Sequence, residues 1–224
     1  ARLLVHLREL SDRISREFGA DPALVHVVPH AVPHHRLPDG APPRHGDRVI
    51  GFGTLRPVSG SDVPLDPLDR TDPALRWEIM GRGEPDLERA VESMARQRPS
   101  LTATIGHVDE QAKAEAFDRA DLVVLPYTAF ESQSGVLHDA YAHGVPVVVT
   151  DVGALGATVR EDGTGRVVRP GDADALLESV GALLADDAGR AELAMATEAV
   201  AEARSPERVA ELLHDLYASV TAPD

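Results

Sequence analysis

Short apolar runs alternate with longer amphipathic segments from residue 48 to the end of the chain. Two of the runs, DLVVLPY (121–127) and PVVVTDV (146–152), are almost continuously apolar, which is typical of strands buried on both faces of a parallel sheet. Further strands are predicted at 48–53, 75–83, 101–108 and 165–170. Helices are predicted at 86–98, 109–120, 135–144, 173–186, 187–203 and 206–220.

Strands that alternate with helices of this length imply right-handed βαβ crossovers. The sequence therefore predicts an α/β fold with a doubly wound, mainly parallel, six-stranded sheet. In such sheets ligands bind beyond the carboxyl ends of the strands, where loops and helix N-termini converge. The candidate positions are 53–60, 81–84, 106–108 and 127–139.

The first 47 residues have a different pattern. Residues 1–19 carry apolar side chains at helical spacing, and Gly19 can end the helix that they predict. VHVVPHAV (25–32) is typical of a short strand broken by Pro29, and the Pro-rich segment 33–47 of a linker. We therefore divide the chain into an N-terminal segment (1–47), a sheet domain (48–204) and a final helix (205–224).

Composition narrows the possible partners. The chain has 224 residues, 43% of them hydrophobic, so it can bury a core. A formal net charge of −15 argues against nucleic acid, whose phosphates require a basic face, and against a strongly anionic membrane surface. Zero cysteines suit a cytoplasmic location, and no apolar run has membrane-spanning length. Because the chain begins with Ala and not Met, we expect a piece of a longer protein.

The segment 126–153 holds the best candidate site. A buried strand ends at Pro126, a polar loop follows, and Ser134 is a suitable N-cap for the next helix, which Gly144 closes. The amides at the start of that helix, up to that of Leu137, can point into the cleft, and Gly135 leaves room for a phosphate. The alternative is an ordinary serine cap, with nearby acids satisfying the helix dipole.

The spacing of two acids makes a family resemblance specific. Glu131 and Asp139 are separated by seven residues, and Ala140-x-Ala142-x-Gly144-x-Pro146-Val-Val follows. This pattern resembles the signature of family 4 glycosyltransferases, which have two Rossmann-like halves (the GT-B architecture). The likeness covers nearly the whole chain and continues through TDVGALGATVREDGTGRVVRPGDADALLESV (150–180). It implies the C-terminal, nucleotide-sugar-binding half, without the N-terminal, acceptor-binding half.

The resemblance also implies roles for residues of this segment. Glu131 is the catalytic candidate and would face the donor sugar, while Asp139, where the family usually has Glu, would take the ribose hydroxyls. Ser134, Gly135 and Val136 would hold the diphosphate.

Two further segments complete the implied donor site. His107 and Val108 would lie against the base through their backbone, and Arg82 is a secondary candidate.

The loop GFGTLRPVSG (51–60) departs from the family pattern. Aligned on Gly53, it has Thr54 and Ser59 where the family has an arginine and a lysine that neutralise the diphosphate. Loss of such groups commonly costs several kcal/mol of transition-state stabilisation. Arg56 lies between the two positions and could replace them. The loop is therefore either rewired or degraded.

Two functions remain open at this point. The first is a glycosyltransferase that moves a sugar from a nucleotide-diphospho-sugar to a hydroxyl acceptor. We expect this transfer to proceed with retention and without a metal, and we expect this fragment alone to turn over little or nothing. The second is a non-catalytic binding or assembly module of the same fold, which the loss of both cations favours. A nucleotide-sugar epimerase fits the 126–146 pattern less well.

Other residues fit structural roles better than chemical ones. His30, His34 and His35 lie in the linker without helical spacing or a paired acid, so we expect no metal there. His138 and His143 are expected to be surface or packing residues, and Trp77 is expected in the core.

Overall fold

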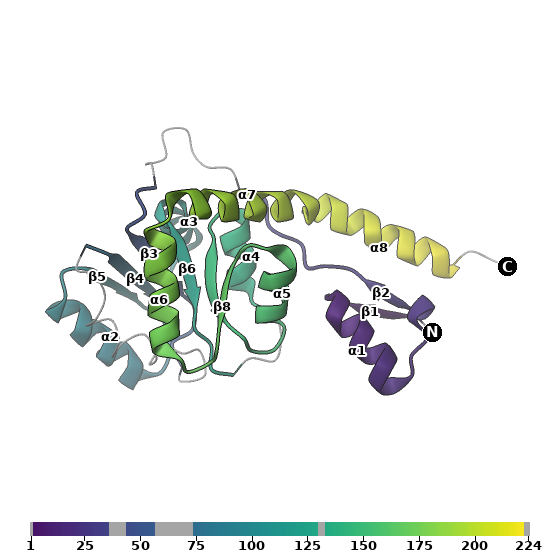
Figure 1. The fold of residues 1–224 in the computed structure, drawn as a ribbon, viewed down its shortest axis with the longest axis horizontal. Helices are drawn as coiled ribbons and strands as arrows, with labels where there is room; N and C mark the ends of the chain where they lie inside the picture. The colour runs from purple at the N-terminus through teal and green to yellow at the C-terminus, as the bar shows by residue number, and fades with distance from the viewer. Residues whose placement is uncertain (1, 36–43, 57–73, 130–132, 222–224) are drawn as a thin grey trace.

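The computed structural model describes residues 2–35, 44–56, 74–129 and 133–221. Its main feature is a six-stranded sheet in the order β5-β4-β3-β6-β7-β8, in which every pair is parallel (Figure 1). The strands are β3 (Arg48–Phe52), β4 (Arg76–Gly81), β5 (Leu101–Ile105), β6 (Leu122–Leu125), β7 (Val147–Thr150) and β8 (Gly165–Val168). The predicted doubly wound, parallel, six-stranded sheet is confirmed.

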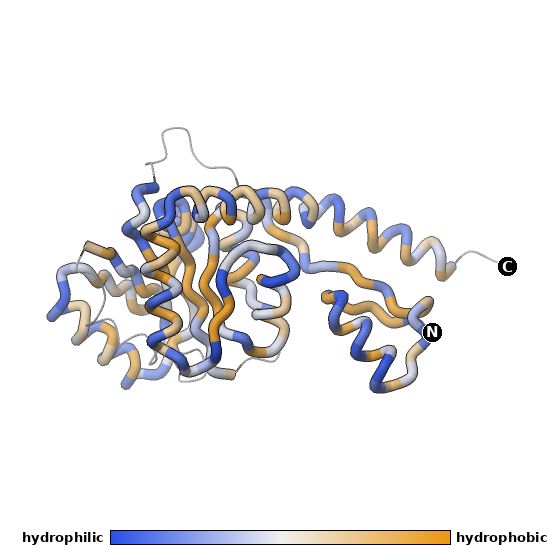
Figure 2. The backbone as a smooth tube through the Cα atoms, viewed as in Figure 1, coloured by the Kyte–Doolittle hydropathy of each residue, from blue (hydrophilic) through white to orange (hydrophobic). Residues whose placement is uncertain are grey.

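The two apolar runs form the centre of this sheet. All residues of β6 and all residues of β7 are buried, as their continuous apolar sequence predicted. Their partners in register are Val123 with Val147 and Leu125 with Val149. Figure 2 shows the sheet interior as the most hydrophobic part of the trace.

Helices cover both faces of the sheet. One core cluster joins side chains of α3 (Glu110–Arg119), α4 (Gly135–Ala142) and α5 (Leu155–Asp162) to one face of the strands. A second joins α2 (Pro85–Gln97) and α6 (Ala173–Leu184) to the other. Successive strand residues point to opposite faces, so Val49 belongs to the second cluster and Ile50 to the first. Trp77 is 4% exposed, which confirms its predicted place in the core.

The N-terminal segment is a small βαβ unit and not a helix followed by a strand. β1 (Leu3–Val5), α1 (Arg8–Phe18), a 3₁₀ turn (Pro22–Leu24) and β2 (Val25–Val27) follow in order, and β1 pairs in parallel with β2. The prediction of one helix over 1–19 is therefore wrong in its first part, because apolar residues at 3–7 suit a strand as well as a helix turn. Gly19 ends α1 with φ 67°, as predicted.

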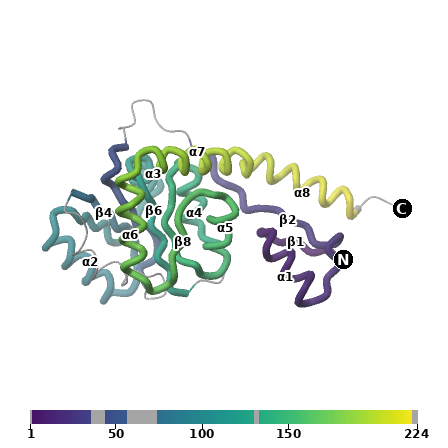
Figure 3. Tube along the Cα trace, viewed as in Figure 1, coloured from purple at the N-terminus to yellow at the C-terminus, as the bar shows by residue number. Residues whose placement is uncertain are grey.

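Two helices complete the chain, and the second of them contacts the N-terminal segment. α7 (Asp187–Ala203) packs against α4, and α8 (Pro206–Thr221) continues past the sheet towards the β1–β2 pair (Figure 3). There Arg2 donates hydrogen bonds of 2.8 and 3.1 Å to the hydroxyl and the carbonyl of Ser219. The final helix thus crosses to the N-terminal segment of this chain. No helix in the described ranges is long and apolar enough to cross a membrane.

Candidate functional site

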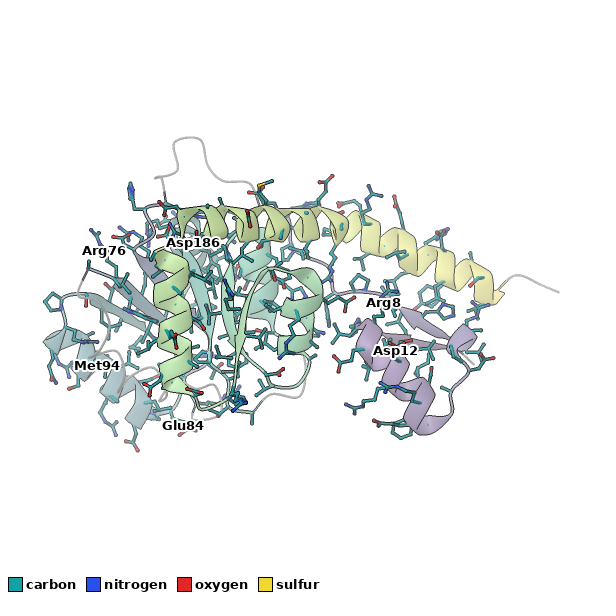
Figure 4. All side chains as sticks on the ribbon, in the orientation of Figure 1. Arg8, Asp12, Arg76, Glu84, Met94 and Asp186 are labelled. Atoms are coloured by element: carbon teal, nitrogen blue, oxygen red, sulfur yellow. The ribbon has the colours of Figure 1, made fainter. Side chains whose placement is uncertain are left out.

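Glycines stand at the carboxyl ends of three neighbouring strands: Gly53 follows β3, Gly81 is the last residue of β4, and Gly106 follows β5. Arg76 and Glu84 mark the two ends of the β4 region in Figure 4, and the carboxyl edge lies on the side of Glu84. Gly53, Gly81 and Gly106 all have positive φ, of 134°, 143° and 119°. A Cβ on Gly81 would lie 1.8 Å from the carbonyl oxygen of Gly53, so only glycine allows this approach. Gly53 and Gly106 are half-buried and Gly81 is buried, and we refer to these three turns together as the glycine shelf.

The N-terminus of α4 stands beside this shelf. A Cβ on Gly53 would lie 3.8 Å from Cγ2 of Val136, which places the loop after β3 against the first turn of α4. Gly135 is exposed, and apart from its chain neighbours and the backbone of its own helix, no described atom lies within 4 Å of a Cβ built on it. The described residues also provide no hydrogen-bond acceptor for the amides of Gly135 and Val136. None of the described residues therefore pairs with these two amides at the start of α4.

Ser134 caps α4, which confirms the N-cap predicted from the sequence. Its side chain is the N-cap of α4 and accepts a hydrogen bond from the Leu137 amide at 3.3 Å. The residue is 2% exposed, and its hydroxyl also lies 3.2 Å from the Tyr127 hydroxyl. The serine oxygen is thus directed into the protein, and the expectation that the Leu137 amide faces the cleft is wrong.

The loop after β3 is anchored at Leu55. Leu55 is buried, accepts a hydrogen bond from Glu84 N, and donates one to the carbonyl of Arg82 at 3.0 Å. Thr54 and Arg56, on either side of it, are exposed. Arg56 and Arg82 therefore lie on two turns at the carboxyl edge, and these turns contact each other through Leu55. Ser59 lies outside the described residues.

Asp139 is linked to α3 by a lysine that the sequence analysis missed. Lys113 Nζ lies 3.4 Å from Asp139 Oδ1 and 2.8 Å from Glu110 Oε2. Burial alone would lower the pKa of Lys113, but its hydrogen bond to Glu110 and the charge of Asp139 raise it, so the ammonium stays charged. The sequence feature that could have pointed to this contact is the position of Lys113, four residues after Asp109, the N-cap of α3. Glu131 lies outside the described residues.

The base-side candidates precede α3. His107 is exposed, whereas Val108 is half-buried and packs against the first core cluster. Asp109 then caps α3 by accepting from Ala112 N at 2.8 Å. Because Lys113 joins α3 to Asp139, this loop and the first turns of α4 belong to one region of the edge.

The histidines assigned to packing are buried, but two linker histidines do have acidic partners. His138 and His143 are each 7% exposed, and burial lowers the pKa of both. His34 lies 2.8 Å from Glu207, and His35 lies 2.7 Å from Asp118. The statement that the linker histidines lack a paired acid is therefore wrong, because the acids come from distant helices.

Comparison with known proteins adds evidence that does not depend on this geometry. A family model described as "Glycosyl transferases group 1" matches residues 47–186. A D-inositol 3-phosphate glycosyltransferase of Xylanimonas cellulosilytica is 29% identical over 98% of this chain and 57% of its own length. A phosphatidyl-myo-inositol mannosyltransferase of Mycobacterium leprae is 34% identical over 65% of this chain and 39% of its own length.

The solved structures agree on the fold. HepE of Anabaena, in complex with UDP, superposes with a TM-score of 0.74 at 17% identity, over 98% of this chain and 63% of that one. The chain thus spans about half the length of the curated relatives that it matches.

Proposed function

The chain belongs to the group 1 glycosyl transferases, and we propose that it is the donor-binding half of an enzyme that transfers a sugar from a nucleotide-diphospho-sugar to a hydroxyl acceptor. The observation that carries the proposal is the N-terminus of α4 beside the glycine shelf, where no described residue accepts from the amides of Gly135 and Val136. A helix N-terminus carries roughly half a positive charge and unpaired amides, and is a ready site for a phosphate. The UDP bound to the structural neighbour HepE is consistent with such a ligand.

The proposed diphosphate site uses backbone more than side chains. The amides of Gly135 and Val136 would donate to phosphate oxygens, and Gly53 would allow the phosphates to approach the loop after β3. Ser134 contributes indirectly, because its hydroxyl fixes the first turn of α4. This assignment differs from the direct phosphate contact expected for Ser134.

Arg56 is the proposed replacement for the two missing loop cations. The buried Leu55 and its bonds to the 82–84 turn hold the backbone next to Arg56, whose side chain is exposed and can turn towards the phosphates. Arg82 supplies a second guanidinium on the adjoining turn. A chain with a net charge of −15 needs such local cations to bind an anion.

The sugar parts of the donor would contact acids. Asp139 would accept from the ribose hydroxyls, held in place by Lys113, and Glu131 would contact the donor sugar. In the reaction the bond from the anomeric carbon to the diphosphate oxygen breaks, and a bond to the acceptor oxygen forms while the acceptor hydroxyl loses its proton. The amides and Arg56 stabilise the negative charge on the departing diphosphate. We propose that the transfer proceeds with retention and needs no metal at this point.

Calorimetry with UDP, GDP and ADP tests the proposal on this chain. At least one nucleotide should bind, and Gly135→Val should weaken binding at least tenfold, because it fills the space above the amides without a clash. Arg56→Ala should also weaken binding, whereas Arg13→Ala, a change of an arginine on α1 that is 60% exposed, should not.

Each outcome has a distinct meaning. Binding that Arg56→Ala leaves unchanged would refute the rewired loop while leaving the amide site intact. Failure of all three nucleotides to bind would instead favour the non-catalytic module, for which the Thr54 and Ser59 substitutions are the evidence.

A further inference from the structure

Three side chains that are far apart in the sequence meet at the opposite end of α4 from the donor site. His35 comes from the segment after β2, Asp118 from the last turn of α3, and His143 from the C-cap of α4. His35 Nε2 and His143 Nδ1 each lie 2.7 Å from the same oxygen, Asp118 Oδ1. The two imidazole rings are stacked, with centroids 3.6 Å apart.

The cluster is almost completely enclosed. The side chains of His35, Asp118 and His143 are 19%, 9% and 6% exposed. Within the described ranges, Asp118 forms ion-pair contacts only with these two histidines. Arg44, the nearby cation, donates to the carbonyls of His143 and Gly144, at 2.7 and 2.9 Å. A buried carboxylate thus faces two imidazoles through one oxygen atom.

We propose that His35, Asp118 and His143 bind a divalent transition-metal ion of the zinc class. Two imidazole nitrogens and one carboxylate oxygen are a ligand set that suits Zn²⁺, and their ligand atoms all lie within 4.8 Å of one another. The fourth position is left for water, which can enter on the side of His35, the most exposed of the three.

Binding requires a small rearrangement. Ligands about 2.0 to 2.1 Å from Zn²⁺ in a tetrahedral site are roughly 3.3 Å apart, compared with the present 2.7 Å contacts. The carboxylate must therefore withdraw slightly, and the rings, now tilted by 28°, must splay so that both nitrogens face the ion.

The site is structural in this proposal. Ser134 and His143 are nine positions apart on α4, or about 13 Å at the helical rise, so the ion does not contact the donor diphosphate. It ties the segment that leaves the β1–β2 unit to α3 and α4. The ion therefore fixes how the chain enters the six-stranded sheet, and the inference does not depend on the proposed transfer.

Titration with Co²⁺, followed by its visible absorption and by competition with Zn²⁺, tests the site on the whole chain. One equivalent should bind, with the strong absorption of a four-coordinate ion. His35→Gln and Asp118→Asn should weaken binding at least tenfold. His34→Gln is the matched control, because His34 is the adjacent histidine but pairs with Glu207 outside the cluster. Circular dichroism in EDTA checks that each variant folds.

Stability gives a second measurement. At a free Zn²⁺ concentration of one hundred times Kd, the unfolding constant of the parent chain and of His34→Gln should fall about 100-fold. That effect should be lost in His35→Gln. Absence of saturable binding would overturn the proposal. An equal response in His34→Gln and His35→Gln would also overturn it, because the ion would then bind among the other histidines of the ten in the chain.

Discussion

Replacement of Ser134 by alanine separates a capping role from a phosphate-binding role. The serine oxygen accepts from the Leu137 amide at 3.3 Å and lies 3.2 Å from the Tyr127 hydroxyl, in a residue that is 2% exposed. Loss of an N-cap typically costs about 1 kcal/mol. We therefore expect Ser134→Ala to lower the free energy of unfolding by roughly 1 to 2 kcal/mol.

Urea unfolding measures that loss, and calorimetry with a nucleoside diphosphate measures the effect on the site. Because the hydroxyl faces inward, affinity should fall less than tenfold, or by less than about 1.4 kcal/mol. Tyr127→Phe removes the other hydroxyl of the pair, and the double variant should lose less than the sum of the single losses. A stability within about 0.5 kcal/mol of the parent, together with a larger loss of nucleotide affinity, would refute the capping assignment.

Three other changes test the packing and the protonation that support the site. Gly81→Ala should lower the free energy of unfolding, measured in urea, by more than about 3 kcal/mol, because its Cβ would lie 1.8 Å from the Gly53 carbonyl oxygen at a φ of 143°. A loss below about 1 kcal/mol would show that the backbone of Gly53 and Gly81 can move apart. Arg204→Met should lower the free energy of unfolding by about 3 to 5 kcal/mol, because it leaves the Asp162 carboxylate, which is 3% exposed, without its guanidinium. Asp162→Asn in the same background should recover part of this loss. Burial lowers the pKa of three histidines in the folded chain, so the unfolded chain binds more protons as the pH falls through about 6.5. The thermal midpoint of unfolding should therefore decrease when the pH is lowered from about 7.5 to about 5.5. The three histidines are His30, His138 and His143. A midpoint that is constant over this range, measured without added metal, would contradict the last expectation.

Periodicity predicted the parts of the fold that local sequence determines. β6 and β7 are continuous apolar runs and are buried along their whole length, so their identity did not depend on distant residues. β1 could not be recognised in this way, because its strand character depends on pairing with β2, some twenty positions later. α5 was missed for a related reason: it is short, and glycines stand close to it on both sides.

The candidate site was predictable where it depends on backbone position. Glycines after strands and a serine before an apolar helix are local signals, and the structure brings Gly53 and the first turn of α4 together. The direction of a side chain is not a local signal. The inward orientation of Ser134 depends on Tyr127, and the Lys113–Asp139 and His35–Asp118 pairs join elements that only the tertiary fold brings into contact.

The charges at the carboxyl edge explain why a single loop arginine matters for the proposed function. Lys113 is already shared between Glu110 and Asp139, so its charge is largely offset before any donor binds. The N-terminal end of α4 contributes roughly half a unit charge, which is less than a diphosphate requires. Thr54 adds a hydroxyl and no charge where the family has arginine. For the proposed donor site we therefore expect Arg56 and Arg82 to supply the remaining positive charge. Of these two described residues, only Arg56 lies in the loop that approaches the first turn of α4.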